Sequence, residues 1–379
     1  MPNFIDRLSE KLADEHKKKE LTATLSDKAL THEESLQNLV KQHWHKLPKI
    51  EMGNRRPAFA IDGSRAVRHL ANGAYLFVAQ ALIVGDQQGE RMEDSQVDVR
   101  ILPGNTDSAV AERFAGLMMH RLEVSLAQEH AQRMPIGSVI FLDGALYGQM
   151  TSLYPLEVDE NAPLPDDVRE LPQKIVDLYM DLFKMCEERR LMLVSIAKTS
   201  HESAHGEAWW REAHPEKEKM PREISDSEMI YRWTNRESGC STPILFGKNA
   251  FVRGARRALM GIVENAPAII SFFVRLADYD DALRIDVPAN CLGHGEKIGD
   301  VKIEQLIDSK EIYSVLELLR ADYGGLEVYN AMLYSVDREV RLRQEMMDEV
   351  YFNVIKNELE KEPGIEIRLD RSERRFHST

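Results

Sequence analysis

The chain has 379 residues, of which 43% are hydrophobic and 30% charged, a composition typical of a folded globular protein and not of a disordered or fibrous one. Its three cysteines, Cys186, Cys240 and Cys291, include no Cys-x-x-Cys pair, which argues against a disulfide framework or a thiolate zinc site and favours a reducing compartment. The formal charge of −14 excludes whole-molecule attraction to nucleic acid, so a DNA partner would need a local basic surface.

The first 50 residues are predicted to form a helical arm. Residues 4–45 contain neither Gly nor Pro. Apolar residues recur there at helical spacing, at Leu8, Leu12, Leu36 and Val40. Charges stand where a signal peptide has its apolar core, and the most apolar stretch, around residues 269–274, is too short to span a membrane. We therefore expect a cytoplasmic protein without membrane contact.

The next segment is predicted to alternate strands and helices. Three apolar runs, PAFAIDGS, ANGAYLFVAQALIVG and VDVRILPG, indicate three successive strands. A helix capped by Asp107 then runs to about Ala131, and the strand GSVIFLDG, a helix over 166–189 and the strand LMLVSIA follow. Three antiparallel strands followed by two crossover units is the order of the ribonuclease H-like fold, a mixed α/β sheet flanked by helices.

The remainder of the chain is predicted to be partly insertion and partly helical. Residues 200–265 favour a helical insertion, and IISFFVRL and LRIDVP indicate two further strands that extend the sheet. Helices are expected over residues 301–319 and 335–361, the second being a long C-terminal helix that Pro363 ends.

Two of the apolar strands end in the same way, in FAIDG with Asp62 and in VIFLDG with Asp143. Each Asp-Gly taken alone is ordinary turn chemistry. If the first and fourth strands are parallel neighbours about 4.8 Å apart, however, the two carboxylates emerge side by side. Such a pair needs a shared proton or a cation, and carboxylate oxygens favour magnesium or manganese over zinc. Paired ions of this kind are typical of phosphodiester hydrolysis.

Five runs in register resemble the NurA nuclease family: FAIDGS, HRLEVSLA, FLDGALYG, SIAKTS and FVRLADYDDALRIDVP. The resemblance implies a ribonuclease H-like DNase that uses Mn²⁺ or Mg²⁺, with two ions expected. It further implies a homodimer working with a HerA-type hexameric ATPase in DNA end processing or in defence against foreign DNA. The nuclease domain is expected over residues 56–342, between the arm of residues 1–50 and a C-terminal helix and tail over 343–379.

Three acidic residues match the metal-binding positions of the family: Asp62, Glu123 and Asp143. Glu123 lies at the border of the apolar face of its helix, where it reaches the sheet end or pairs in solvent, and Glu112 and Glu129 are alternatives in other registers. Lys198 matches a basic position after the last core strand, where a cation holds a scissile phosphate or orients a water, unless it is an ordinary surface lysine. Arg65, in a basic cluster, is the other DNA-binding candidate.

The C-terminal motif EVYNAMLYSVDREV departs from the family pattern. Tyr329 keeps the tyrosine of that pattern, Asn330 replaces its proline, and Asp337 stands where a metal-binding histidine is expected. Aspartate still binds Mn²⁺ or Mg²⁺, which keeps Tyr329 and Asp337 among the catalytic candidates. The alternatives are an ion pair between Asp337 and Arg341, and a catalytically silent DNA-binding or scaffold subunit of the same ATPase complex.

A competing motif comes just after the fifth predicted strand. His201, Glu202 and His205 spell H-E-x-x-H, which on one helix binds the zinc of a metallopeptidase. Its context is poor, because IAKTS leads straight from a strand and the extended metzincin spacing is absent. The chain also lacks a phosphate-binding loop, so we expect any ATP hydrolysis to come from a partner.

Overall fold

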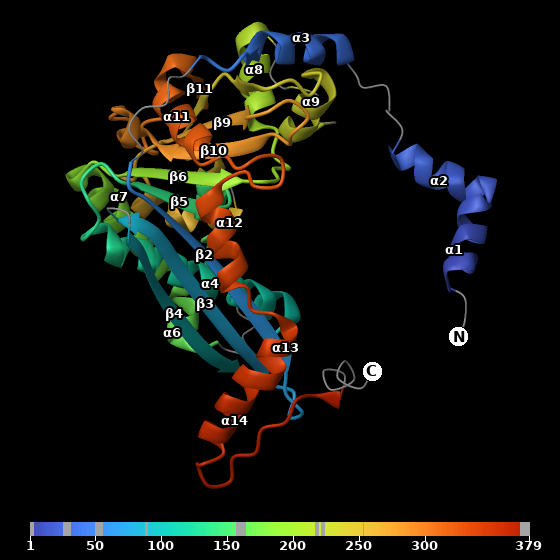
Figure 1. Ribbon diagram of the computed structural model, residues 1–379, viewed down its shortest axis with the longest axis vertical. Helices are drawn as coiled ribbons and strands as arrows, with labels where there is room; N and C mark the ends of the chain where they lie inside the picture. The colour runs from blue at the N-terminus through green and yellow to red at the C-terminus, as the bar shows by residue number, and fades with distance from the viewer. Residues whose placement is uncertain are drawn as a thin grey trace.

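The computed structural model is an α/β protein in which a single mixed sheet is flanked by helices (Figure 1), as the sequence predicts. The structure describes the following residues: 4–25, 32–49, 56–87, 90–156, 164–216, 220, 224–252 and 254–371. The last part of the expected C-terminal tail, residues 372–379, lies outside this range.

One side of the sheet is the predicted antiparallel unit of three long strands, β2 (Ala58–His69), β3 (Tyr75–Gln87) and β4 (Glu90–Leu102). The strands of the two crossover units, β5 (Val139–Asp143) and β6 (Met192–Ala197), continue from β2 in parallel. Antiparallel strands then extend the sheet in the order β10 (Leu283–Pro288), β9 (Ile269–Arg275), β7 (Gly239–Ser241) and β1 (Trp44–His45), with β8 (Ile244–Phe246) pairing with β9 and β11 (Gln305–Leu306) with β8. The five core strands therefore follow the predicted order.

Side chains alternate along the strands between an apolar core on each face of the sheet. The helices α4 (Ser108–Ala131) and α7 (Leu171–Arg189) cover one face, and α11 (Tyr313–Ala321) and α12 (Ala331–Val340) cover the other. In β2, Phe59 and Ile61 belong to the first core and Ala58 and Ala60 to the second. We call these two surfaces the α4 face and the α12 face.

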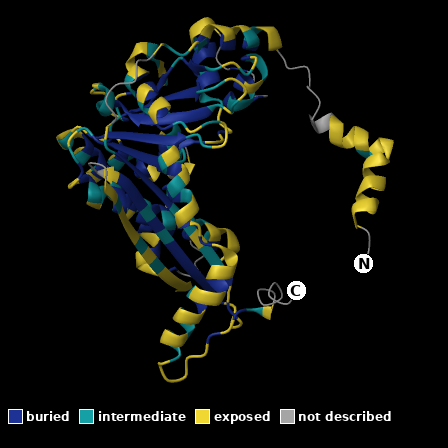
Figure 2. Ribbon diagram, viewed as in Figure 1, coloured by how far each residue is buried: buried dark blue, intermediate teal, exposed yellow. Residues whose placement is uncertain are grey.

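The remaining α-helices are short. They are α1 (Phe4–Ala13), α2 (Glu15–Leu25), α3 (Glu33–His43), α5 (Leu146–Thr151), α6 (Asp166–Arg169), α8 (Ala204–Ala213), α9 (Asp226–Trp233), α10 (Met260–Val263), α13 (Gln344–Met346) and α14 (Phe352–Leu359). In the arm, α1 has no buried residue, and the side chains of residues 15–22 in α2 are exposed apart from the half-buried Lys17 (Figure 2). By contrast, α3 buries Leu36, Leu39 and Val40 in a cluster with Trp209 and Trp210. No described helix has the length and the apolar run that a membrane crossing requires.

Three expected elements differ in the structure. The segment expected as a helical insertion also contributes β7 and β8, because its GCS and ILF runs pair with β9. Residues 301–312 contain β11 and a 3-10 turn instead of a helix, so α11 begins only at Tyr313. The C-terminal helix is interrupted after Val340, whose carbonyl accepts from Gln80 Nε2 at 2.6 Å, while the N–H of Leu342 donates to Ser64 Oγ at 2.8 Å. Side chains of β2 and β3 thus replace helical hydrogen bonds at the break.

Candidate active site

Asp62 and Asp143 lie side by side on the α12 face, on the neighbouring parallel strands β2 and β5. The last paired residues are Ile61 and Leu142, which places the two aspartates next in register. By alternation they continue the rows of Ala60 and Phe141, both of which belong to the core under α12. Asp62 Oδ1 accepts the N–H of the following glycine at 2.8 Å, and Asp143 Oδ1 does the same at 3.0 Å.

The expectation that Asp62 ends its strand is wrong, since β2 continues to His69. Gly63 therefore forms no turn, and its lack of a side chain has another reason. A Cβ on Gly63 would lie 2.5 Å from Glu123 Oε1 and 2.6 Å from Met119 Cγ. The glycine thus lets the carboxyl group of Glu123 approach the strand from the α4 face, beside Asp62.

Gly63→Ala is expected to destabilise the fold by about 1–3 kcal/mol, because its methyl group must displace Glu123 and Met119 from packed positions. Thermal unfolding measures this loss. Gly261→Ala is the matched control, since a Cβ there meets nothing within 4 Å. An unfolding temperature for Gly63→Ala equal to that of the control would contradict the close approach of Glu123.

Lys198 follows β6 on the same sheet edge and contacts the acidic pair directly. Its Nζ lies 3.1 Å from Asp143 Oδ2 and 4.9 Å from the ring centre of Tyr329. Although burial disfavours the charge, Asp143 and Tyr329 hold the pKa of Lys198 above its ordinary value. Burial, with the negative charge of Asp143 adding to it, raises the pKa of Tyr329 to about 12. At neutral pH Lys198 is therefore a cation and Tyr329 a neutral phenol.

Asp337 reaches the site from α12, which crosses the sheet over β2 and β3 (Figure 1). Asn330, the residue that replaces the family's proline, begins this helix as its N-cap, and its Oδ1 accepts the N–H of Leu333 at 2.9 Å. The charge of Asp337 contributes to the raised pKa of Asp62. Asp337 and Arg341 are both described and form no ion pair, so the structural alternative for Asp337 has no support.

The acidic groups of the cluster repel one another, and Lys198 offsets this repulsion only in part. Burial raises the pKa of Asp62 to about 7, and Asp143 and Asp337 add to this effect, which the Gly63 N–H and Lys198 only partly offset. Burial likewise raises the pKa of Glu123 to about 8, with the charges of Asp62 and Asp143 adding to it. A cation bound among these carboxyl groups would favour their ionised forms and so lower the pKa of both.

The donor set fits Mn²⁺ or Mg²⁺, because it consists of carboxylate oxygens without sulfur. Because Gly63 has no Cβ, the carboxyl group of Glu123 fits against the strand beside Asp62. Within the described part of the chain, no three His, Cys, Asp or Glu side chains already stand close enough together to hold one ion. Binding would therefore draw the carboxylates inward.

A model of the NurA domain matches residues 56–342, more than half of the chain. The chain belongs to the NurA family. The solved NurA nuclease from Sulfolobus solfataricus is 16% identical, with a TM-score of 0.60, and the match covers 95% of this chain and 98% of that one. A second NurA structure is 14% identical with a TM-score of 0.51, over 94% of this chain and 97% of that chain. No curated protein matches the sequence. These likenesses show the fold, and membership of the NurA family supports a nuclease.

The other acidic and basic candidates lie outside the NurA acidic cluster. Arg65 donates to the backbone carbonyl of Glu112 and lies 3.7 Å from its carboxylate, so these two residues pair with each other. Glu129 accepts from Gln96 Nε2 at 2.9 Å and from Ser125 Oγ at 3.0 Å, on the exposed side of α4. Of the three glutamates weighed from the sequence, only Glu123 is electrostatically coupled to Asp62 and Asp143.

The H-E-x-x-H motif of this NurA chain does not form a zinc-binding helix face. His201 and Glu202 precede α8, which begins at Ala204, so the two histidines do not share a helix. His205 is fully buried between Asp226 Oδ2 at 3.3 Å and the carbonyl of Ser271 at 3.2 Å. Glu202 pairs with Arg284. His205 and Glu202 thus have structural partners, and these three side chains do not stand together as a metal-binding group.

Sequence reasoning missed a buried pair behind the turn that follows Asp143. Arg284 and Asp286 are 2% and 0% exposed, and Arg284 Nε lies 3.0 Å from Asp286 Oδ1. Asp286 Oδ2 accepts the N–H of Tyr147 at 3.0 Å, at the start of α5. The pair therefore anchors the segment after Asp143. Its signal was present in the run LRIDVP, where two opposite charges alternate with apolar residues inside a strand.

Proposed function

We propose that this NurA-family chain hydrolyses phosphodiester bonds in DNA with two Mn²⁺ or Mg²⁺ ions. The observation that supports the proposal is that Asp62 and Asp143 stand next to each other in register on β2 and β5, with Glu123 against Gly63 and the charge of Asp337 acting on Asp62. Asp62, Asp143 and Asp337 would hold the ions from the α12 face, and Glu123 would support them through the gap at Gly63.

The chemistry that paired divalent ions supply in such sites is activation of a water and stabilisation of the leaving oxygen. Lys198 would bind a non-bridging oxygen of the scissile phosphate, because its charged Nζ stands 3.1 Å from Asp143 at the edge of the cluster. Tyr329 packs against Lys198 and, as a neutral phenol, would donate a hydrogen bond to the same phosphate. Lys198 and Tyr329 thus orient the substrate.

The proposal includes partners that the NurA resemblance implies. The chain would act as a cytoplasmic homodimer with a HerA-type hexameric ATPase, in DNA end processing or in defence against foreign DNA. The sequence has no phosphate-binding loop of its own, which suits a nuclease driven by a separate ATPase. The exposed helices α1 and α2 of the arm offer a surface for that partner.

Asp337 gives the sharpest test of this function, because the family expects histidine there. Asp337→Asn is expected to lower cleavage of end-labelled single- and double-stranded DNA about a hundredfold in Mn²⁺ or Mg²⁺, since it removes one charged donor. Asp337→His should restore cleavage to within about tenfold of the original, since imidazole binds Mn²⁺. EDTA should stop cleavage by every variant.

Asp181→Asn is the matched control, an exposed aspartate of α7 outside the cluster, and it should cleave normally. Full activity of Asp337→Asn would remove Asp337 from the metal site. If the unaltered chain is inert with both metals, both DNA forms and the partner ATPase present, the catalytic proposal is wrong and the silent scaffold takes its place.

A further inference from the structure

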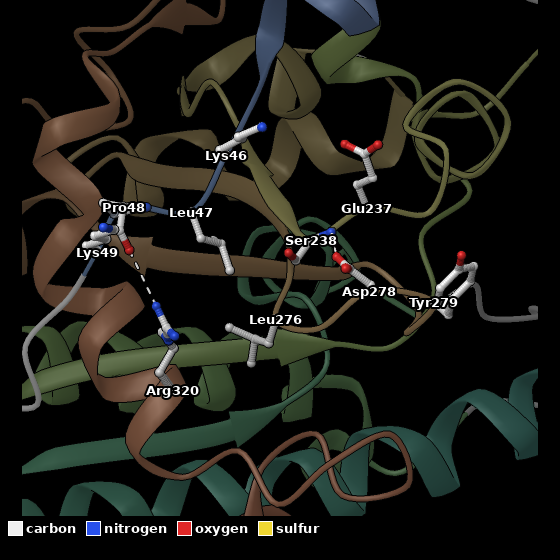
Figure 3. Close-up of a pocket in the computed structure, with 10 residues that line it drawn as sticks. All are labelled: Lys46, Leu47, Pro48, Lys49, Glu237, Ser238, Leu276, Asp278, Tyr279 and Arg320. Atoms are coloured by element: carbon white, nitrogen blue, oxygen red, sulfur yellow. Dashed lines mark hydrogen bonds between the residues drawn. The ribbon is translucent and has the colours of Figure 1, made fainter.

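A second site lies on the same sheet edge as the acidic cluster. It is a pocket of about 790 Å³ between the end of the arm, the turn after β9 and the end of α11 (Figure 3). Part of its lining is basic, apolar or aromatic: Lys46, Lys49, Arg320, Leu47, Leu276 and Tyr279. We call it the arm pocket. Figure 3 shows Lys49 and Arg320 on one side and Tyr279 on the other, with Leu47 and Leu276 between them.

No described residue forms an ion pair with the basic residues of the arm pocket. Lys46 and Lys49 are exposed, and neither forms an ion pair with any described residue. Arg320 Nη1 donates to the carbonyl of Pro48 at 3.4 Å, which leaves its charge without an acidic partner in the described chain. Two carboxylates also line the pocket, Glu237 and Asp278, but they lie on the side away from Lys49 and Arg320 (Figure 3). The Lys49 side is therefore suited to an anion.

The opposite wall is rigid and presents an aromatic ring. Arg275 is 1% exposed and donates to Thr234 Oγ1 at 2.6 Å, to the carbonyl of Glu237 at 3.0 Å and to that of Asp280 at 2.8 Å. These bonds tie the turn after β9 to the loop before β7. Tyr279 in this turn has a φ of 67° and is 72% exposed. Its N–H donates to the carbonyl of Arg236 at 2.8 Å, so this backbone hydrogen bond fixes the position from which the exposed ring projects.

The register of the sheet relates the arm pocket to the acidic cluster. Across the sheet, Asp143 of β5 pairs with Ile196 of β6, Ile196 with Ile285 of β10, and Ile285 with Phe272 of β9. Phe272 is therefore three strands from Asp143, and Leu276 lies four residues beyond Phe272 toward the edge of the sheet. With strands about 4.8 Å apart and a rise of about 3.3 Å per residue, the separation is roughly 20 Å. This separation is short enough for one bound strand to reach both sites, a few nucleotides apart.

We propose that the arm pocket binds the DNA strand a few nucleotides from the bond that is cut. Lys46, Lys49 and Arg320 contact its phosphates, and Tyr279 stacks on one base. Exposed aromatics beside cations are the usual means of binding single-stranded nucleic acid without sequence preference. This inference rests on the proposed DNA-cleaving function, and it gives the end of the arm a role in substrate binding.

Binding of a fluorescent oligothymidylate, followed by anisotropy over a series of salt concentrations, tests the proposal with the full chain in EDTA. The double variant Lys46→Ala with Lys49→Ala is expected to weaken binding at least about tenfold and to lower the salt slope by about 1.4, because each lost phosphate contact removes about 0.7 on single strands. Tyr279→Ala is expected to weaken binding about tenfold with the slope unchanged.

The matched control is Lys302→Ala with Lys310→Ala, which removes two exposed lysines that form no ion pair with described residues. The carbonyl of Val301, the residue before Lys302, accepts the N–H of Lys248. Lys248 follows the end of β8 that pairs with the start of β9, so Lys302 lies at the sheet edge opposite the arm pocket. Oligothymidylate binding by both pocket variants at the strength of this control would overturn the proposal, as would absence of binding by the unaltered chain. Because this readout needs no cleavage, failure of the nuclease activity alone would count against the proposed function and not against the pocket.

Discussion

Asp62→Asn is expected to reduce DNA cleavage by about a thousandfold or more while leaving the fold intact. Asp62 interacts with the other charged groups of the site, because Asp143, Asp337 and Lys198 all affect its pKa. Asparagine has nearly the same shape, keeps one oxygen and removes the charge that attracts a divalent ion. Initial rates of Mn²⁺-dependent cleavage of end-labelled DNA measure the loss.

The same substitution should stabilise the metal-free protein at alkaline pH. Asp62 is 9% exposed and its pKa is raised to about 7, so above that pH the folded protein contains a buried charge that asparagine removes. This second readout separates a lost ligand from a damaged fold. Asp181→Asn should change neither cleavage nor stability. If Asp62→Asn cleaves DNA within tenfold of the unaltered chain, the acidic cluster is not the active site.

The sequence could predict the core of the fold because each strand carries its own local pattern. The run VIFLD forms β5 as expected, and Asp107 caps α4 by accepting the N–H groups of Ala109 and Val110 at 2.8 and 3.3 Å. The parallel pairing of the first and fourth strands followed from their order, and it brings Asp62 and Asp143 into register.

What the sequence could not predict depends on contacts between distant segments. Asp62-Gly63 has the pattern of a turn, yet the strand continues because α4 packs against the bare glycine. The helix expected over residues 335–361 breaks where Gln80 and Ser64 bond its backbone. The arm pocket joins residue 46 to residue 320, and no local periodicity carries such information.

The second large effect is a coupling of pH, metal and stability. In the unfolded chain Asp62 and Glu123 ionise near 3.8 and 4.5, whereas in the folded protein their pKa values are raised to about 7 and about 8. The folded state therefore keeps protons that the unfolded state releases, so stability decreases as pH rises. The contribution is fully present below about pH 4 and is lost as the pH passes through 7 and 8.

Buried histidines act in the opposite direction and must be separated from this effect. Burial lowers the pKa of His43 and of His120 to about 4, so these residues make the protein more stable as pH rises and contribute little further change above about pH 7. Above about pH 7 the carboxyl groups therefore dominate, and the three cysteines, whose thiol pKa values burial raises, add to the decrease only as the pH approaches 9. Subtracting the free energy of unfolding of Asp62→Asn from that of the unaltered chain at each pH removes most of the contribution of the other titrating groups.

In EDTA, the unaltered chain is expected to be less stable at pH 8.5 than at pH 6.5 by roughly 2–3 kcal/mol, and Asp62→Asn should show about half of that decrease. Adding Mn²⁺ at pH 8.5 to about 100 times its dissociation constant should return about 2.7 kcal/mol, because the ion binds the folded state alone. At pH 5.5 the same addition should have little effect, since protons occupy the carboxyl groups. Denaturant unfolding at the three pH values, with and without Mn²⁺, measures these differences. A stability that is independent of pH above 7, or a Mn²⁺ effect that is equal at pH 5.5 and 8.5, would show that Asp62 and Glu123 do not share a cation site.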